Sequence, residues 1–145
     1  MKNYHWLDME VAQLDAYDHS AQLVILRDDS GAITEGPGFN VFAYVDGRWL
    51  TPASGTLAGI TRRSLIELAA EAGDQVQQGR LSASDLRRAA EVLITSTAGG
   101  IMPVTLVDGQ PVGPGTPGPL TTSLRERYWA RHEDPRFSSP VRYGG

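Results

Sequence analysis

The chain has no cysteine, which excludes disulfide bonds, thiolate catalysis and cysteine-ligated zinc sites. It also lacks an apolar run close to the roughly 18 residues that a membrane helix needs, and no apolar signal segment follows the N-terminus. Positive charge is scarce too, because 13 Lys plus Arg stand against 17 Asp plus Glu. This net charge of -4 argues against nucleic acid or an anionic membrane as the main partner. We therefore expect a cytoplasmic protein.

The length and composition are those of an ordinary globular domain. At 145 residues the chain is long enough for one domain with a real core, and its 41% hydrophobic and 21% charged residues are typical of soluble proteins. The arginines around Arg62, Arg87 and Arg125 are interpreted as solvated helix faces. The histidines at 5, 19 and 132 show no metal-ligand spacing, so no metal site is expected.

Helical and extended patterns alternate along the chain, which predicts an α/β fold. Apolar periodicity and capping signals predict four helices: residues 6–17, from an N-cap at Thr61 to Gly73, residues 82–90, and a last helix carrying Leu120, Leu124 and Tyr128. Apolar runs predict strands at residues 23–26, 41–45, 48–50, 92–94 and 102–107. Two tight hairpin turns are expected at the Asp-Gly pairs 46–47 and 108–109.

The segment 33–42 places one carboxylate, that of Glu35, in a bend between two strands. Glu35 precedes Gly36-Pro37-Gly38, which favours a turn, and an apolar strand follows. A carboxylate at this place needs a cationic partner, because an unpaired buried charge costs several kcal/mol or becomes protonated. No basic residue lies nearby in sequence, so the partner comes from elsewhere in the fold or from a ligand with a protonated nitrogen.

Two segments have the residue types that bind anions. Gly59-Ile60-Thr61 leads into a helix N-terminus, where free N–H groups favour a phosphate or carboxylate. Ser96-Thr97 follows a buried strand with hydroxyl side chains. Each signal is weak alone, since any capped helix and any Ser/Thr turn looks the same. Lys2 by itself is most simply a solvated terminal residue, and the aromatic residues Trp6 and Phe39 are most simply core residues.

Four segments taken together, in this order, resemble the class IV aminotransferases, the fold-type IV pyridoxal phosphate enzymes. They are residues 2–8 (KNYHWLD), 34–40 (TEGPGFN), 57–62 (LAGITR) and 95–100 (TSTAGG). The resemblance is greatest to the branched-chain aminotransferase and (R)-selective amine transaminase branch. It implies pyridoxal 5′-phosphate as cofactor and the family's larger domain as fold, a mixed sheet curled into a partial barrel with helices outside.

The resemblance assigns a role to each candidate residue. Lys2 matches the catalytic lysine that holds the cofactor as a Schiff base, and Glu35 matches the carboxylate that pairs with the pyridine nitrogen. The other positions that match cofactor contacts are Leu57 against the ring face and Gly59, Ile60, Thr61, Ser96 and Thr97 around the phosphate. Positions that match the substrate side are Trp6, Phe39 and Ala98.

The implied reaction moves an amino group from an amine or amino acid to a 2-oxo acid. The expected organisation is a cofactor-binding larger domain at 1–132 and a tail at 133–145, without the family's smaller N-terminal domain. We accordingly expect a truncated enzyme that works as a homodimer or with a second chain supplying the smaller domain. Two alternatives remain open: a lyase of the aminodeoxychorismate type, and a non-catalytic domain that binds a partner.

Overall fold

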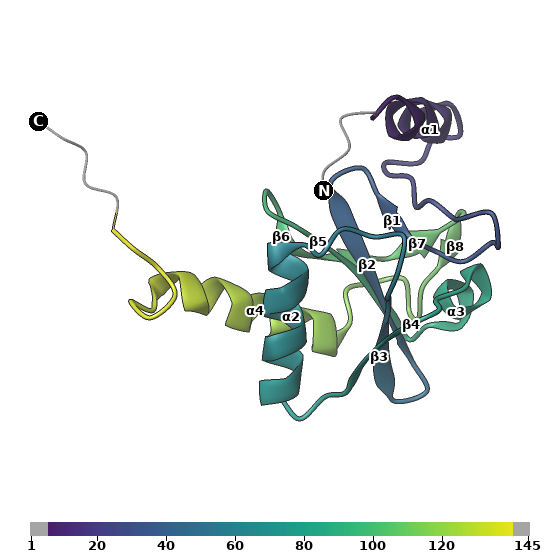
Figure 1. Cartoon of the computed structure of the whole chain (residues 1–145). Coiled ribbons are helices and arrows are strands. Elements are labelled where there is room, and N and C mark those ends of the chain that lie inside the picture. The colour runs from purple at the N-terminus through teal and green to yellow at the C-terminus, as the bar shows by residue number, and fades with distance from the viewer. Residues whose placement is uncertain (1–5, 141–145) are drawn as a thin grey trace, which may run out of the picture.

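A computed structural model describes residues 6–140 as a mixed β-sheet with helices on both of its faces (Figure 1). Within this part of the chain the helices are α1 (Leu7–Asp18), α2 (Ile60–Glu71), α3 (Ala83–Arg88) and α4 (Pro119–Glu133). The strands are β1 (Glu35–Gly36), β2 (Phe39–Val45), β3 (Arg48–Pro52), β4 (Val76–Gly79), β5 (Glu91–Ser96), β6 (Gly100–Val104), β7 (Leu106–Val107) and β8 (Gln110–Pro111). The predicted mixed α/β class is therefore confirmed.

The main sheet has the order β4-β3-β2-β5-β6, with β1 paired to β2, while β7 and β8 form a separate ribbon. All pairs are antiparallel except β3 with β4, which are parallel and are joined through α2. A parallel pair needs such a crossover, because its second strand must return to the same end of the sheet.

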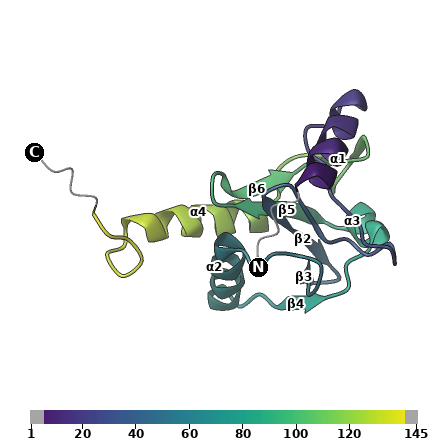
Figure 2. The same cartoon turned by 45° about the horizontal axis from the view of Figure 1, so that its top comes forward.

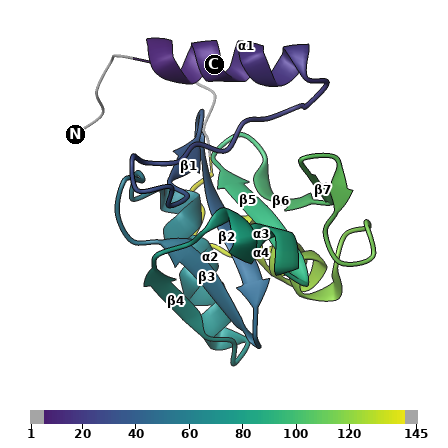
Figure 3. The same cartoon turned by 90° about the vertical axis from the view of Figure 1, so that its right-hand side faces the viewer.

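The two faces of the sheet carry separate hydrophobic clusters, because successive side chains of a strand point to opposite sides. Phe42, Leu93 and Ile101 pack with residues of α2 and α4 on one face. Val41 and Ile94 pack with residues of α3 on the other face. Figure 2 shows α4 continuing past the edge of the sheet, and Figure 3 shows α1 set apart from it.

Turn and cap signals in the sequence correspond closely to the observed boundaries. Asp46-Gly47 and Asp108-Gly109 have positive φ angles at both positions, 51° and 78° in the first pair and 51° and 72° in the second. These angles match the two-residue hairpin turns predicted from the Asp-Gly pairs. Ser82 and Asp85 form the predicted capping box at the start of α3.

Three local predictions were wrong. Residues 23–26 belong to no strand and Leu23 is 48% exposed, since an apolar run alone does not determine burial. The N-cap of α2 is Gly59 rather than Thr61, so the helix begins two residues earlier than expected. Arg62 is not solvated but only 8% exposed, because the first turn of α2 lies against β3 and β4.

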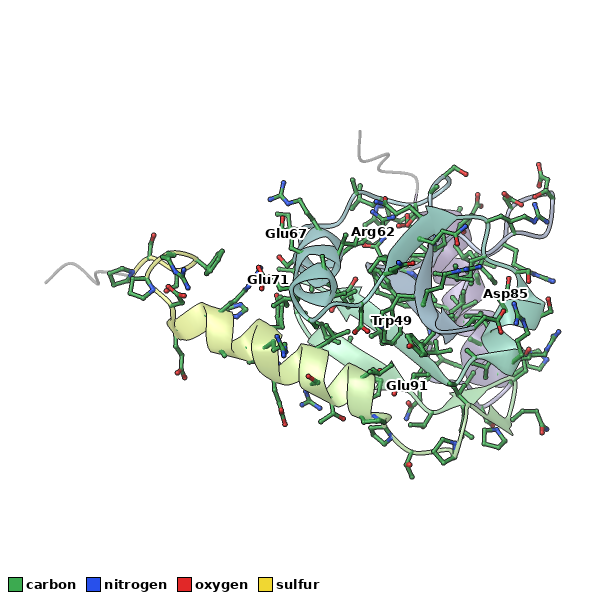
Figure 4. All side chains as sticks on the ribbon, turned by 90° about the horizontal axis from the view of Figure 1, so that it is seen from below. Trp49, Arg62, Glu67, Glu71, Asp85 and Glu91 are labelled. Carbon is green, nitrogen blue, oxygen red and sulfur yellow. The ribbon has the colours of Figure 1, made fainter. Side chains whose placement is uncertain are left out.

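A buried carboxylate fixes the start of α4. Glu91 is 7% exposed, and its two carboxylate oxygens accept hydrogen bonds from the backbone N–H groups of Leu120 (3.0 Å) and Thr121 (2.8 Å). Figure 4 shows Glu91 at this end of the helix. A negative charge there stabilises the helix because the first N–H groups have no partner inside it. At the other end Arg131 forms ion pairs with Glu67 and Glu71 of α2.

The helices within residues 6–140 are too short or too polar for a bilayer. None of them combines the length and the apolar character that a transmembrane span requires.

Candidate functional site

Glu35 lies where β1, the start of β2 and the loop before α2 meet. Its side chain is half-buried, and its Oε2 accepts three hydrogen bonds: from the backbone N–H of Leu57 (2.7 Å), the hydroxyl of Thr56 (3.2 Å) and the amide of Asn40 (3.3 Å). No ion pair to Glu35 occurs among residues 6–140. The carboxylate is thus fixed through one oxygen, without a cationic partner from the described part of the chain.

Asn40 connects Glu35 to the loop before α2. Its Nδ2 donates to the Thr56 hydroxyl at 2.7 Å and to the Leu57 carbonyl at 2.9 Å. Asn40 pairs with Glu35 across β1 and β2 and with Thr95 across β2 and β5, so all three side chains project from the same face. Neither Asn40 nor Thr56 was predicted from the sequence as a site residue, although Asn40 closes the TEGPGFN segment. The sequence feature that could have identified Asn40 is its place in the same matched segment, five residues after Glu35.

The N-terminus of α2 has free backbone N–H groups of the kind that favour an anion. Gly59 is the N-cap, and no side chain of the described residues caps the first N–H groups, which have no intrahelical partner. Ile60 is 73% exposed and Thr61 is 4% exposed. One side of this helical turn therefore faces solvent, and the other side packs against the protein.

Arg62 anchors this helix end to the sheet. Its Nη2 donates to the Pro52 carbonyl (2.9 Å) and to Oε1 of Gln78 (3.0 Å). Burial lowers the pKa of the Arg62 guanidinium from its ordinary value. Arg62 Nε has no hydrogen-bond partner among the described residues. Arg62 is the third residue of α2, so its positive charge belongs to the first turn of the helix and adds to the attraction of the helix N-terminus for an anion.

The hydroxyl segment after β5 forms a turn. The Ser96 hydroxyl accepts a hydrogen bond from the Gly99 N–H at 2.9 Å, and Thr97 and Ala98 are exposed. Thr95, just before it, is 1% exposed and its hydroxyl has no partner in the described part of the chain. Because Thr95 pairs with Asn40, this turn begins at the end of the sheet that carries Glu35.

The remaining predicted residues occupy different environments. Leu57 is 45% exposed, and its backbone N–H binds Glu35. Trp6 is 37% exposed at the start of α1. Phe39 is 6% exposed and packs in the cluster with Val41, on the face opposite Asn40, so its assignment to the substrate stays a prediction. Lys2 lies outside the described residues.

The structure thus brings part of the predicted site together. Glu35 and Leu57 are directly bonded, and Gly59 lies against Asn40, which binds the same loop. No hydrogen bond in residues 6–140 joins Ser96 or Thr97 to the N-terminus of α2. Within residues 6–140, Oε1 of Glu35 accepts no hydrogen bond and no side chain caps the neighbouring helix N-terminus, an arrangement that suits a ligand with a protonated nitrogen and an anionic group.

A substitution at Gly59 measures how closely the loop before α2 is packed against Asn40. A Cβ at Gly59 would stand 2.3 Å from Oδ1 of Asn40, whose side chain is 5% exposed and held by its hydrogen bonds. We expect Gly59→Ala to lower the free energy of unfolding by about 1–3 kcal/mol, as for other overpacked sites. Urea denaturation measures this change.

The matched control is Gly79→Ala, where the nearest atom to a Cβ is 3.7 Å away. The control should denature at the same urea concentration as the unchanged protein. Equal stability of the two variants would contradict the close packing of Gly59 against Asn40.

Residues 1–107 match the protein family described as amino-transferase class IV. The branched-chain-amino-acid aminotransferase of Escherichia coli K12 is 41% identical over 117 residues, which cover 79% of this chain and 38% of that protein. The enzyme of the same name from Pseudomonas aeruginosa is 33% identical over 128 residues, 88% of this chain and 42% of that protein. The chain therefore spans about two fifths of the length of these curated relatives.

Solved structures show the same similarity. The branched-chain amino acid aminotransferase of Thermobaculum terrenum, solved in its PLP form, aligns with a TM-score of 0.82 and 28% identity. The alignment covers 86% of this chain and 41% of that one.

Proposed function

Because the chain belongs to the class IV aminotransferases, we propose that it forms the pyridoxal 5′-phosphate site of a branched-chain amino acid aminotransferase. The observation that carries the proposal is Glu35, whose carboxylate is fixed through Oε2 beside an uncapped helix N-terminus. The proposed cofactor domain spans residues 1–132, with residues 133–145 as a tail. The PLP form of the Thermobaculum terrenum enzyme supports the choice of cofactor.

In this proposal the carboxylate of Glu35 keeps the ring nitrogen of the cofactor protonated through a charge-assisted hydrogen bond. When bound, pyridoxal phosphate supplies a protonated ring that takes up electron density released at the substrate carbon. The backbone of Gly59 and Ile60, with the hydroxyl of Thr61, holds the phosphate at the start of α2. The positive charge of Arg62 and the free N–H groups favour an anion there.

The other residues complete the proposed binding surface. Ser96 and Thr97 bind the phosphate from the turn after β5, and the exposed side chain of Leu57 lies against the ring. Trp6, Phe39 and Ala98 lie near the substrate. Their different burial in the structure makes Trp6 and Ala98 the better supported of the three, because both are exposed.

Lys2 attaches the cofactor and moves the proton at the substrate carbon in this proposal. It is the only lysine in the sequence, and it lies in the segment that matches the family. The other side chains counted as Lys plus Arg are all arginines. An arginine guanidinium stays protonated and does not form a Schiff base, whereas a lysine amine can react with a carbonyl and transfer a proton, which supports a specific role for Lys2.

The proposed substrates are a branched-chain amino acid and a 2-oxo acid. The relatives reported above are branched-chain aminotransferases, which supports these substrates over an (R)-amine and supports transamination over elimination. We also propose a homodimer. Leu7, Val11 and Leu14 of α1 are 73%, 56% and 62% exposed, which gives that helix an apolar surface suited to an interface.

The proposal is tested by trapping the cofactor on the protein. We expect incubation with pyridoxal phosphate, followed by borohydride reduction, to give one stable adduct on the Lys2 side chain by peptide mass mapping. Lys2→Arg should carry no adduct at this position. The same treatment of urea-denatured protein should label Lys2 far less, because only the fold brings Glu35 and α2 to the cofactor. Equal labelling of native and denatured protein would contradict a specific site.

A further inference from the structure

We propose that Asn40 and Thr56 are positioning residues that hold one oxygen of the Glu35 carboxylate and thereby direct the other oxygen at the ring nitrogen of the cofactor. This inference rests on the function proposed above. Neither side chain was predicted from the sequence as a site residue, and together with the Leu57 N–H they bind only Oε2 of Glu35.

The hydrogen bonds between these residues run in one direction. The amide nitrogen of Asn40 can only donate, so the Thr56 hydroxyl accepts its hydrogen at 2.7 Å. The single hydroxyl hydrogen of Thr56 is then free to point at Oε2 of Glu35, 3.2 Å away. The three groups form a chain in which each donor fixes the next acceptor. A fixed hydroxyl orients the carboxylate more strictly than one that rotates freely.

The hydrogen bonds to Glu35 converge on the same oxygen. Oε2 accepts from the Leu57 N–H and from Thr56, and Asn40, whose two amide hydrogens go to Thr56 and to the Leu57 carbonyl, makes a longer, shared contact with it at 3.3 Å. Oε1 accepts no hydrogen bond from any residue that the structure describes. A carboxylate has acceptor capacity on both oxygens, so Oε1 remains available for a cationic N–H donor. The side chain is half-buried, which limits how far water can replace such a donor.

The surrounding fold keeps the donors in place. Asn40 is 5% exposed in β2 and pairs with Glu35 on one side and Thr95 on the other. Its second donated bond goes to the Leu57 carbonyl at 2.9 Å, while the Leu57 N–H binds Glu35. Asn40 therefore holds the backbone of Leu57, the residue proposed to lie on the ring face. One amide side chain couples the ring-nitrogen contact to the ring-face contact.

The test compares two ligands that differ at the ring nitrogen alone: pyridoxal phosphate and its 1-deaza analogue, in which a C–H replaces that nitrogen. We expect the unchanged protein to bind pyridoxal phosphate about tenfold more tightly, the ratio that one charge-assisted hydrogen bond supplies. Dissociation constants are measured by absorbance titration. Glu35→Gln should lower the ratio, because a neutral hydrogen bond to the ring nitrogen replaces the charge-assisted one.

Thr56→Val removes the hydroxyl at nearly constant volume, and Thr56→Ser keeps it. We expect Thr56→Val to lower the ratio about threefold without changing the affinity for the deaza analogue, and Thr56→Ser to retain the full ratio. Asn40→Ala should act in the same direction as Thr56→Val. The melting temperature of each variant, measured without ligand, shows that it is folded.

The possible results separate the two proposals. Equal losses of affinity for both ligands in Thr56→Val, with an unchanged ratio, would mean that Thr56 only supports the loop, and would overturn the inference while Glu35 keeps its role. A ratio near one in the unchanged protein would remove the role of Glu35 itself, and with it both proposals for this carboxylate. A lowered ratio that Thr56→Ser restores supports the positioning role.

Discussion

We expect Glu35→Gln to lower the rate of the proposed half-reaction, in which a branched-chain amino acid converts bound pyridoxal phosphate to pyridoxamine phosphate, by about 100-fold or more. The physical reason is the proton on the ring nitrogen. The amide of glutamine is neutral and can itself donate a hydrogen bond, so it favours an unprotonated nitrogen, which accepts electron density poorly. The conversion is followed by the absorbance change of the cofactor in a single turnover.

The fold should survive this substitution. The glutamine carbonyl can still accept from the Leu57 N–H, which in the unchanged protein binds Oε2 at 2.7 Å, so the free energy of unfolding should change by less than about 1 kcal/mol. Glu126→Gln, at an exposed position of α4, is the matched control and should leave both rate and stability unchanged. A Glu35→Gln protein that turns over at the original rate would contradict the proposed carboxylate–pyridine contact.

Phe42→Ala should cause the largest loss of stability, about 3–5 kcal/mol in the free energy of unfolding. Phe42 is 0% exposed in the middle of β2, in the cluster that joins the sheet to α2 and α4. Truncation removes the ring from its apolar contacts and leaves a cavity that the rigid sheet cannot close. Chemical denaturation monitored by tryptophan fluorescence measures the change, since Trp49 belongs to the same cluster.

Phe137→Ala provides the control for this substitution. Phe137 is 56% exposed, and its ring contacts the guanidinium groups of Arg131 and Arg136. Its loss should lower stability by less than about 1 kcal/mol, the worth of an exposed cation–π contact. Similar losses at Phe42 and Phe137 would contradict the layered core. Phe42 also lies two residues from Asn40 on the same sheet face, so its truncation should weaken cofactor binding as well.

Much of the local structure followed from neighbouring residues. The two Asp-Gly turns, the capping box at Ser82 and the end of α2 before Gly73 each depend on a few contiguous positions, and each is present. Two of the three wrong predictions concern burial, at Leu23 and Arg62, because exposure depends on which distant element covers a residue. The parallel pairing of β3 with β4 was not predicted for the same reason.

In the candidate site, too, some features followed from the sequence and others only from the tertiary structure. The sequence by itself determined the family, through four short motifs spread over residues 2–100, and it singled out the carboxylate of Glu35 and the turn at Gly59 that is proposed to bind an anion. Only the tertiary structure decided what holds that carboxylate. Its nearest donor, the N–H of Leu57, lies 22 residues away along the chain, and Thr56 lies 21 residues away. Hydrogen bonds across such separations exist only once the loop before α2 folds back onto β1 and β2, and no local pattern of residue types encodes that closure.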